Sequence, residues 1–438
     1  MIENRKNIQS GWLTVRKNRL FLIIGSALLI LLFIWLVKPV PRGIDRFYAD
    51  QPYHFNTLRA FGHIPSGGGD TAEILGTIQK IKQGEEESWF TEWEKTGARV
   101  EWMGRSLTNP TSRGLALLRA HNYYRTAEFF LDPDDTRRSK VFRKNQEVFY
   151  EGLNTLKVDY KIIKVPYGEH QLKAIYFPAK GDDGKKPLIV ACGGYDSTLE
   201  ELYFVIVKPA LDRGYSTLIY EGPGQGSIIR EQNLIFTHEW EKPTGAVLDE
   251  FYNQYSQKRK IVLIGMSMGG YLAPSAAAFD NRIDGVVAFD QFHDYQEIAF
   301  HVAPGIVKHL YNLDFLDAIN LLLKLKMKTT PNLRWGIRNA QWTMGVREPI
   351  TIFDVFSKYT LKTVSANIKS DVLILAGEKD HFMPLSHAVD FKNALTNAHS
   401  VELRVFTEEE GGHEHCQLGA SHLWQGVFFD WVEKRFPG

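Results

Sequence analysis

The stretch Lys260-Ile-Val-Leu-Ile-Gly-Met-Ser-Met-Gly-Gly-Tyr-Leu-Ala-Pro-Ser-Ala-Ala-Ala-Phe279 decides the fold of this chain. It contains a short β-branched strand, a serine between glycines, and an alanine-rich helix. A Gly-x-Ser-x-Gly match becomes informative when a strand precedes it and a helix follows it, as they do here. Gly265 and Gly269 remove side chains that would clash around a strained Ser267. The pattern predicts an exposed, nucleophilic serine on a sharp turn; an ordinary glycine-rich connection is the alternative.

A nucleophilic serine needs a base to take its proton and an acid to orient that base. Two acids follow the buried strand Leu373-Ile-Leu-Ala-Gly377. Asp380 is the predicted acid because it lies deeper in the turn before Pro384, and Glu378 is held in reserve. After the last expected strand, His413 and His415 both qualify by position as the base. The chain order serine, aspartate, histidine is that of α/β-hydrolases.

Backbone amides must stabilise the oxyanion that forms when such a serine attacks a carbonyl. The amide of Met268, directly after the serine, is the first predicted donor. The second should come from the loop after the third strand, Gly193-Gly-Tyr-Asp-Ser197, where we predict the Tyr195 amide with Gly194 in reserve. Three acids near the same sheet edge are candidate substrate-pocket residues: Asp196, Glu221 and Asp290.

From residue 156 to 438, expected strands alternate with expected helices. Such alternation predicts an α/β fold with a mostly parallel sheet covered by helices on both faces. The expected strands are 158–165, 171–177, 188–192, 216–220, 261–264, 285–289, 371–376 and 401–406. The expected helices are 199–212, 245–257, 271–279, 386–396 and 419–435. A helical insertion at 291–368 is a candidate lid, with an additional packing layer as the alternative.

The region before residue 156 lacks the residue pattern of β-strands. Apolar residues recur at spacings of three and four from 39 to 155, which predicts a helical N-terminal domain. Residues 20–38 contain an uncharged apolar run long enough to span a bilayer. We predict a transmembrane signal anchor there, and a cleaved signal peptide is the alternative. The preceding residues 1–19 form a basic tail, so the positive-inside rule predicts a cytoplasmic N-terminus and an extracytoplasmic catalytic domain.

Composition excludes several function classes. The formal net charge of +1 and the lack of zinc-finger or phosphate-loop patterns argue against nucleic-acid binding. His413 and His415 form a His-x-His pair, but no further ligands follow at a metal-binding spacing, so we expect neither a metal nor a cofactor. Cys192 and Cys416 are the only cysteines, and two free thiols are favoured over a disulfide between them.

Four motifs together resemble one α/β-hydrolase group. They are Gly193-Gly-Tyr-Asp-Ser197 with Glu200-Glu201, Glu221-Gly-Pro-Gly-Gln-Gly226, Gly265-Met-Ser-Met-Gly-Gly-Tyr-Leu-Ala-Pro274, and Glu409-Glu-Gly-Gly-His-Glu-His-Cys-Gln417. The group includes dihydroxypseudooxynicotine hydrolase and fungal polyketide-shortening hydrolases, and the similarity covers residues 60 to 436. The resemblance implies that Ser267 is the nucleophile, Asp380 the acid and His415, directly before Cys-Gln, the base. It also implies that residues 39–155 and the insertion pack over the active site.

Two features depart from the group. In members of the group, the turn that corresponds to residues 221–226 more often begins with aspartate, where this chain has Glu221. A membrane anchor is also atypical of the group. We therefore expect a membrane-anchored serine hydrolase of an ester or other acyl substrate, partnered by a small molecule and a lipid bilayer. A carbon–carbon hydrolase of a diketone and a non-catalytic binding protein with this fold are the alternatives. A peptidase of the prolyl-oligopeptidase type is disfavoured because the N-terminal region is helical and too short for a propeller.

Overall fold

The computed structural model describes residues 46–255, 258–302 and 305–438. The expected basic tail and signal anchor lie outside these residues. In the part of the chain that is described, no helix combines the length and apolar character needed to cross a bilayer. The chain divides into two compact units, Met1–His54 and Phe55–Gly438. The sheet, its covering helices and all the candidate site residues belong to the second unit.

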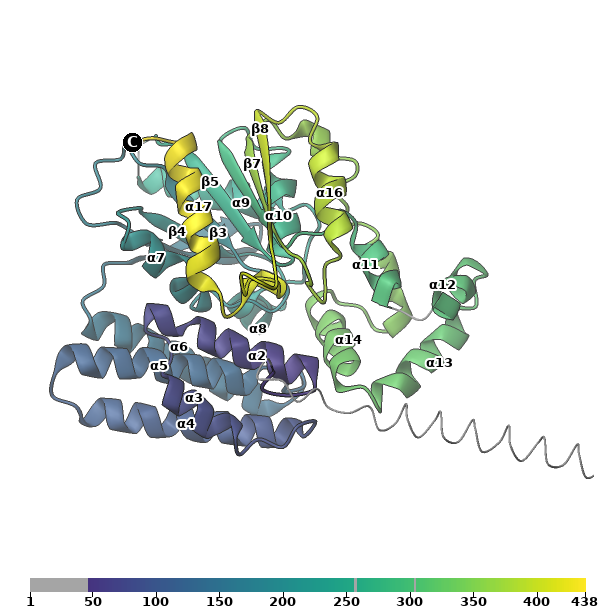
Figure 1. Cartoon of the computed structure of the whole chain (residues 1–438), viewed down its shortest axis with the longest axis horizontal. Helices are drawn as coiled ribbons and strands as arrows, with labels where there is room; N and C mark the ends of the chain where they lie inside the picture. Colours follow the sequence, from purple (N-terminus) through teal and green to yellow (C-terminus); the bar gives the residue numbers. More distant parts are fainter. Residues whose placement is uncertain (1–45, 256–257, 303–304) are drawn as a thin grey trace, which may run out of the picture. The chain divides into compact units, whose positions relative to one another are not determined.

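One eight-stranded sheet forms the centre of the second unit (Figure 1). Its strands lie in the order β1-β2-β4-β3-β5-β6-β7-β8. β2 pairs antiparallel with β1 and β4, and all later pairs are parallel. The strands are β1(Lys161–Tyr167), β2(His170–Phe177), β3(Leu188–Cys192), β4(Thr217–Glu221), β5(Ile261–Met266), β6(Gly285–Phe289), β7(Asp371–Gly377) and β8(Ser400–Phe406). The parallel strands β3 to β7 are buried along their whole length, which explains their continuous apolar sequences.

All eight strands were predicted from the sequence, with one clear error at a boundary. The first strand begins at Lys161 and not at Val158, because Val158 still belongs to the end of the preceding helix. Its amide donates to the carbonyl of Leu153 at 3.0 Å, and Lys157 adopts the left-handed conformation with φ 55°. Such a hydrogen bond with a left-handed residue is a common way for a helix to end. The strand therefore begins three residues later than predicted.

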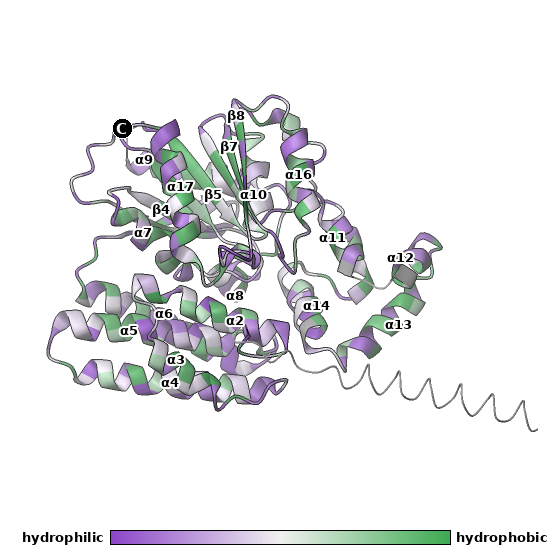
Figure 2. Ribbon diagram, viewed as in Figure 1, coloured by the Kyte–Doolittle hydropathy of each residue, from purple (hydrophilic) through white to green (hydrophobic). Residues whose placement is uncertain are grey.

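Helices cover both faces of the sheet (Figure 1). One apolar core lies against α9(Glu241–Gln254), α10(Gly269–Ala277) and α16(Leu385–Ala394). A second core, on the other face, lies against α6(Thr136–Thr155), α7(Lys208–Leu211) and α17(Ser421–Arg435). The sequence did not predict α8(Gly226–Gln232), and the helix expected at 199–212 consists of a π-helical turn, η2(Tyr203–Val207), followed by α7. Figure 2 shows the resulting pattern, with hydrophobic strands between amphipathic helices.

The N-terminal region is helical, as predicted, and contributes α2(Gln51–Gly62), η1(Ile64–Ser66), α3(Thr71–Ile78), α4(Glu86–Ser106), α5(Pro110–Glu128) and α6. Three of these helices start at a side-chain cap: Asp70 for α3, Asn109 for α5 and Asp135 for α6. Glycines allow α5 to approach its neighbours closely. A side chain at Gly97 would lie 2.9 Å from the Tyr124 ring, and one at Gly104 would lie 2.8 Å from Ala116.

The insertion between β6 and β7 is helical, as predicted. It contains α11(Tyr295–Val302), α12(Gly305–Asn312), α13(Leu316–Met327), α14(Pro331–Thr343), η3(Pro349–Thr351), α15(Ile352–Phe356) and η4(Ser365–Asn367). Its third helix, α13, exposes several leucines. Its helix α14 contacts the N-terminal region: Trp335 donates to the Phe129 carbonyl at 2.9 Å, and Arg338 donates to Asp132 at 2.7 Å.

Candidate active site

Ser267 lies on the sharp turn between β5 and α10. Its backbone has φ 59°, a conformation that costs free energy in a residue with a side chain. The Ser267 amide donates to the carbonyl of Phe289 at 2.9 Å, and its carbonyl accepts from Gly270 at 2.7 Å. A side chain at Gly265 would lie 1.9 Å from the carbonyl oxygen of Gly269. A side chain at Gly269 would lie 2.8 Å from the carbonyl oxygen of Gly193, so close backbone approach requires glycine at both positions.

One imidazole connects the serine to an acid. His415 follows β8, and its Nε2 lies 2.8 Å from Oγ of Ser267, while its Nδ1 lies 2.6 Å from Oδ2 of Asp380. An ionised carboxylate can only accept, so Nδ1 donates to Asp380 and leaves Nε2 as the acceptor for the serine hydroxyl. The structure thus brings together the three side chains that the sequence singled out.

The acid is held by its own turn. Oδ1 of Asp380 accepts hydrogen bonds from the amides of Phe382 at 2.7 Å and Met383 at 2.9 Å, which leaves Oδ2 for the histidine. Burial alone would lower the pKa of His415, but the adjacent Asp380 charge and the contact with Cys416 raise it well above its usual value. The imidazolium that forms when a serine loses its proton is therefore stabilised at this position.

A second buried carboxylate, Asp290, lies directly after β6. It connects β7 to the loop of the histidine: Oδ1 accepts from the Gly377 amide at 2.9 Å, and Oδ2 accepts from the Cys416 amide. Its Oδ2 lies 4.0 Å from Nδ1 of His415, beyond hydrogen-bond distance. Burial, followed by the charge of Asp380, raises the pKa of Asp290 to about 7. Asp290, predicted as a pocket residue, therefore contacts the backbone that carries the base.

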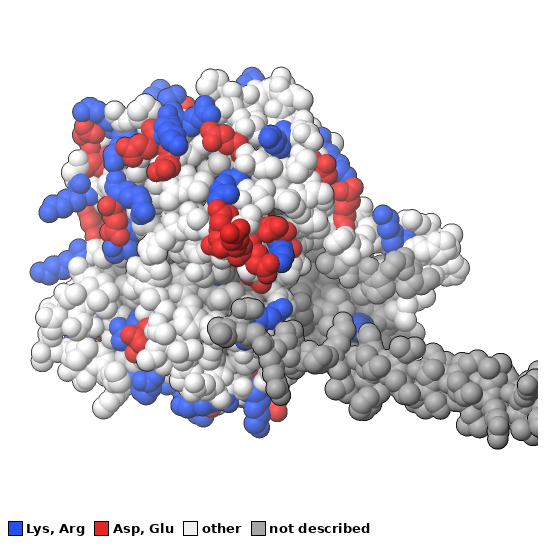
Figure 3. Space-filling model, in the orientation of Figure 1, with Lys and Arg blue, Asp and Glu red and all other residues white. Residues whose placement is uncertain are grey.

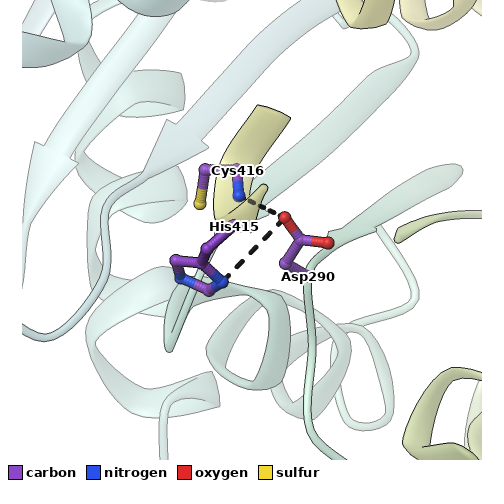
Figure 4. Close-up of side chains that lie close together, drawn as sticks. All are labelled: Asp290, His415 and Cys416. Carbon is purple, nitrogen blue, oxygen red and sulfur yellow. Dashed lines mark hydrogen bonds and ion pairs between the residues drawn. The ribbon is translucent and has the colours of Figure 1, made fainter. Parts of the chain in front are cut away.

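Asp290, His415 and Cys416 carry atoms that could act as metal ligands. Ligand atoms of Asp290, His415 and Cys416 lie within 4.8 Å of one another in the described chain (Figure 4). However, Nδ1 of His415 already bonds to Asp380, and Oδ2 of Asp290 already accepts from the Cys416 amide. A metal would have to displace both interactions, so the donor set fits a hydrogen-bonded network better than a metal centre. Both cysteines are free thiols.

The loop after β3 passes directly over the serine. A side chain at Gly194 would lie 2.8 Å from the carbonyl oxygen of Met266, 3.0 Å from Cβ of Ser267 and 3.1 Å from the Met268 nitrogen. Among the described residues, the amides of Tyr195 and Met268 donate to no protein acceptor. Two amides without acceptors beside a serine form the kind of site that binds an oxyanion.

The reserve residues lie elsewhere. Glu378 is exposed, and its Oε2 accepts from the Glu408 amide at 3.1 Å. His413 contacts β7 through its backbone, where its carbonyl accepts from the Lys379 amide at 3.2 Å. Figure 3 shows acidic side chains gathered where β8 ends, at the exposed turn that contains Glu408 to Glu410. Neither reserve residue contacts Ser267 or His415.

Glu221, another predicted pocket residue, is buried, and its carboxylate accepts hydrogen bonds from Leu199 and Ser227. Its Oε1 accepts from the Leu199 amide at 2.8 Å, and its Oε2 accepts from the amide and hydroxyl of Ser227 at 2.9 and 2.6 Å. Gln225, in the same turn, donates to two carbonyls of the loop over the serine. The sequence predicted Glu221 of this turn as a pocket residue but gave no signal for Gln225.

Asp196, the third predicted pocket residue, forms an ion pair with the N-terminal helices. Arg59 of α2 donates to Asp196 at 2.6 Å and makes two bonds to Glu201, at 2.5 and 2.6 Å. Arg125 of α5 reaches Glu201 at 3.2 Å, and the Phe129 ring lies against both guanidinium groups. The sequence gave no signal for Arg59 because its partners lie more than 130 residues away. This network fixes the helical domain to the loop over the serine.

Aromatic side chains from three regions surround the site. Phe55 of α2 and Phe382 after β7 lie 5.9 and 5.1 Å from the His415 ring. The Tyr195 ring stacks on Phe236 and meets the edge of Trp335 from α14. Trp335 in turn stacks on Phe129 of the N-terminal region at 4.7 Å. The helical domain and the insertion therefore meet beside the serine.

Comparison with known proteins agrees with this arrangement. The model of the α/β hydrolase fold family matches residues 186–416, more than half of the chain. The chain belongs to the α/β-hydrolase fold family. The α/β-hydrolase fold predicted from the sequence is thereby confirmed, and this α/β-hydrolase carries its serine after β5 and its histidine after β8.

Several fungal hydrolases are similar to this α/β-hydrolase. Hydrolase acrC of Aspergillus aculeatus is 28% identical, over 89% of this chain and 98% of its own. The 20-hydroxy-prefusarin hydrolase FUS2 of Gibberella moniliformis is 28% identical, over 90% and 98%. Hydrolase ffsE of Aspergillus flavipes is 32% identical, over 74% and 79%.

Among solved structures, 2,6-dihydroxy-pseudo-oxynicotine hydrolase has the same fold, with a TM-score of 0.67 and 21% identity over 86% of this chain and 96% of that chain. AbyA5 matches with a TM-score of 0.62 and 17% identity, over 87% and 94%. Both matches extend beyond the region of the family model and include N-terminal helices. The predicted resemblance to this group of hydrolases is therefore confirmed.

Proposed function

We propose that this hydrolase cleaves an ester or other acyl bond of a small molecule by serine catalysis. One observation carries the proposal: the His415 ring lies 2.8 Å from the Ser267 hydroxyl through one nitrogen and 2.6 Å from Asp380 through the other. This is the arrangement that raises the nucleophilicity of a serine. The strained φ of Ser267 supports the same role, because such strain concentrates at functional sites.

In the proposed mechanism, Nε2 of His415 takes the hydroxyl proton as Ser267 attacks the substrate carbonyl. The negative charge that develops on the carbonyl oxygen is met by the amides of Tyr195 and Met268. His415 then donates its proton to the leaving group, and an acyl group remains on Ser267. Water, deprotonated by the same imidazole, releases the acid and restores the serine.

The surroundings of the serine favour a substrate with an apolar or aromatic part. Phe55, Phe382 and Trp335 come from the N-terminal helices, the acid turn and the insertion, and they meet near the His415 and Tyr195 rings. Flat apolar side chains supply contact area, while the amides and the histidine supply orientation. We propose an aryl or alkyl ester, or a ketone of similar shape, as the substrate class.

Carbon–carbon cleavage of a diketone is the second candidate. The same serine, base and amides would act on a ketone carbonyl, with a carbon leaving group protonated in place of an alkoxide. The solved hydrolase of 2,6-dihydroxy-pseudo-oxynicotine shares the fold over 96% of its own chain. A direct comparison of aryl esters with β-diketones separates the two reactions.

The function is tested with Ser267→Ala, and with Ser370→Ala as a matched control. Ser370 is buried and bonds to the Ile283 carbonyl at 2.7 Å, just before the start of β7 and so at the sheet edge opposite to the serine. We expect Ser267→Ala to lower turnover of the accepted substrate by at least ~1,000-fold and to abolish labelling by a fluorophosphonate probe. Ser370→Ala should retain both. Unlabelled wild-type protein would favour a non-catalytic binding protein.

We further propose that residues 20–38 anchor the enzyme in a bilayer, with the N-terminus cytoplasmic and the catalytic domain on the other side. The support is the uncharged apolar run and the basic residues before it. Reporter fusions after residue 50 test this topology. An active alkaline phosphatase fusion is the expected result, whereas a bright cytoplasmic reporter would contradict the orientation.

A further inference from the structure

We propose that Gln225 is a positioning residue for the oxyanion site. Its side-chain amide holds two peptide groups of the loop after β3 in the orientation that presents the Tyr195 amide to the substrate. The inference rests on the proposed function, since it assigns Gln225 a part in the same reaction. No feature of the sequence alone identifies this residue as different from any other turn glutamine.

The side chain of Gln225 is buried and hydrogen-bonded through both its nitrogen and its oxygen. Its Nε2 donates to the carbonyl of Gly193 at 2.8 Å and to the carbonyl of Gly194 at 3.1 Å. Its Oε1 accepts from the Gly222 amide at 3.0 Å, which fixes the direction of the carboxamide. The side chain is only 2% exposed, so water does not compete for these bonds.

The two carbonyls decide where the neighbouring amides point. In a planar trans peptide the C=O and N–H bonds point in opposite directions. The Gly193 carbonyl shares its peptide with the Gly194 amide, and the Gly194 carbonyl shares its peptide with the Tyr195 amide. Because both carbonyls face Gln225, both amides face away from it. The Tyr195 amide has no acceptor within the described chain, as an oxyanion donor requires before substrate binds.

Because residue 194 is glycine, the loop can lie directly against Ser267. A side chain there would lie 3.0 Å from Cβ of Ser267 and 3.1 Å from the Met268 nitrogen. Glycine, however, permits peptide rotations that other residues exclude. Rotation of the peptide between Gly194 and Tyr195 would exchange an N–H for a carbonyl oxygen and repel the developing oxyanion. The bonds from Gln225 oppose this rotation.

The turn that carries Gln225 is tightly packed. A side chain at Gly224 would lie 2.1 Å from the Phe236 ring, and one at Gly226 would lie 1.6 Å from Oε1 of Glu221. Glu221 also accepts from the Leu199 amide, at the far end of the same loop. The turn therefore fastens the loop at both ends, through Gln225 near Gly193 and through Glu221 at Leu199. This explains how a glycine-rich loop keeps one geometry.

The test compares Gln225→Met with Gln425→Met in the full chain. Methionine keeps the size of glutamine and removes the donor. Gln425 is a matched control because it is equally buried, at 2% exposed, and donates to one carbonyl, that of Val205, at 3.0 Å. Turnover of an aryl ester and inhibition by a trifluoromethyl ketone, which forms an oxyanion on Ser267, are measured together. Thermal unfolding of each variant reports the folded fraction.

We expect Gln225→Met to lower kcat about 100-fold, with KM changed less than about threefold, and to weaken the trifluoromethyl ketone by a similar factor. Gln425→Met should change neither. A Gln225→Met enzyme with wild-type kcat and inhibition would overturn the inference, as would losses that match those of Gln425→Met at equal stability. Retained turnover in Ser267→Ala, measured in the same assay, would contradict the proposed function itself.

A second variant distinguishes the loss of a hydrogen-bond donor from a folding defect. Gln225→Glu keeps the shape of the side chain and can donate to a carbonyl only while its carboxyl group is protonated. We expect its turnover, expressed as a ratio to wild type at each pH, to rise as the pH falls. The ratio removes the titration of His415, which both enzymes share. A ratio that does not vary with pH, in a folded variant, would contradict a donor role for residue 225.

Discussion

Nδ1 of His415 lies 2.6 Å from Oδ2 of Asp380, whereas Asp290, also buried, lies 4.0 Å from the same nitrogen. Both carboxylates follow neighbouring strands of the sheet, and only one bonds to the imidazole. Asp380 is turned toward the ring because its other oxygen accepts two amides of its own turn. Asp290 is turned toward the backbone of Gly377 and Cys416. The two acids therefore have different expected effects on activity.

Asp380→Asn should lower kcat by about 10,000-fold, because the amide favours the wrong tautomer of the histidine. It should also move the pH dependence. The proposed base acts in its neutral form, so kcat/KM rises with pH as His415 loses its proton. Since Asp380 is the main group that raises the pKa of His415, its neutralisation should shift this rise to lower pH. A pH profile of kcat/KM measures both effects; an unchanged midpoint would contradict the assignment.

Asp290→Asn should change the pH dependence of stability. In the folded protein, burial and the Asp380 charge raise the pKa of Asp290 from 3.8 to about 7. The folded state thus holds this proton more tightly than the unfolded chain, and the free energy of unfolding falls as pH rises between these values. Urea unfolding at a series of pH values should show a weaker fall for Asp290→Asn than for wild type. Parallel curves would show that Asp290 does not titrate in this range.

Arg59→Met should destabilise the protein by about 3–5 kcal/mol, because Asp196 and the buried Glu201 then lose their main partner. Turnover should fall as well, since Asp196 follows Tyr195 in the loop over the serine. Lysine should not restore either property, because it cannot make the paired bonds to Glu201. Denaturant unfolding and ester turnover are the measurements.

The control for Arg59 is Lys208→Met, which removes an exposed ion pair with Asp212. An exposed pair contributes at most about 1 kcal/mol, so little change is expected. Equal effects of Arg59→Met and Lys208→Met would show that the link between α2 and the loop is dispensable.

Gly194→Ala should reduce activity strongly, because the new methyl group would lie 2.8 Å from the Met266 carbonyl oxygen and 3.1 Å from the Met268 nitrogen. The loop must then move away from Ser267 and carry the Tyr195 amide with it. We expect kcat to fall by about 100-fold or more. Gly426→Ala is the control, since a side chain there meets nothing within 4 Å and α17 tolerates alanine. Retained turnover in Gly194→Ala would exclude a close role for this loop.

Much of the fold could be predicted because its signals are local. β3 and β6 have the predicted bounds, since continuous apolar runs reflect burial directly. Two of the predicted elements differ from the structure. The sequence of 199–212 has helical spacing, but the structure has a π-helical turn, Tyr203–Val207, within it. Val158 was predicted in a strand, but its amide bonds to Leu153 at the end of the preceding helix.

The candidate site was predicted in part. Ser267 and its turn followed from glycine and serine spacing, and Asp380 followed from its position after a strand. Position left His413 and His415 both open as the base, and the family resemblance selected His415. Gln225 and Arg59 could not be predicted, because their importance depends on partners 32 and 137 residues away. Asp290 was predicted as a pocket residue, yet its contacts are with the backbone of the histidine loop, which no pattern in the sequence expresses.

The sequence by itself determined the order of strands and helices and the chemistry available after each strand, because hydrophobic period and turn residues act over short distances. By position alone, His413 and His415 both qualified as the base, and Glu378 was held in reserve for Asp380. The tertiary structure places His415 against a serine 148 residues away and Asp380 against its ring. The sheet order, with β4 between β2 and β3, brings these strand ends to one edge. Distances across that edge are set by packing of whole elements, which local sequence does not encode.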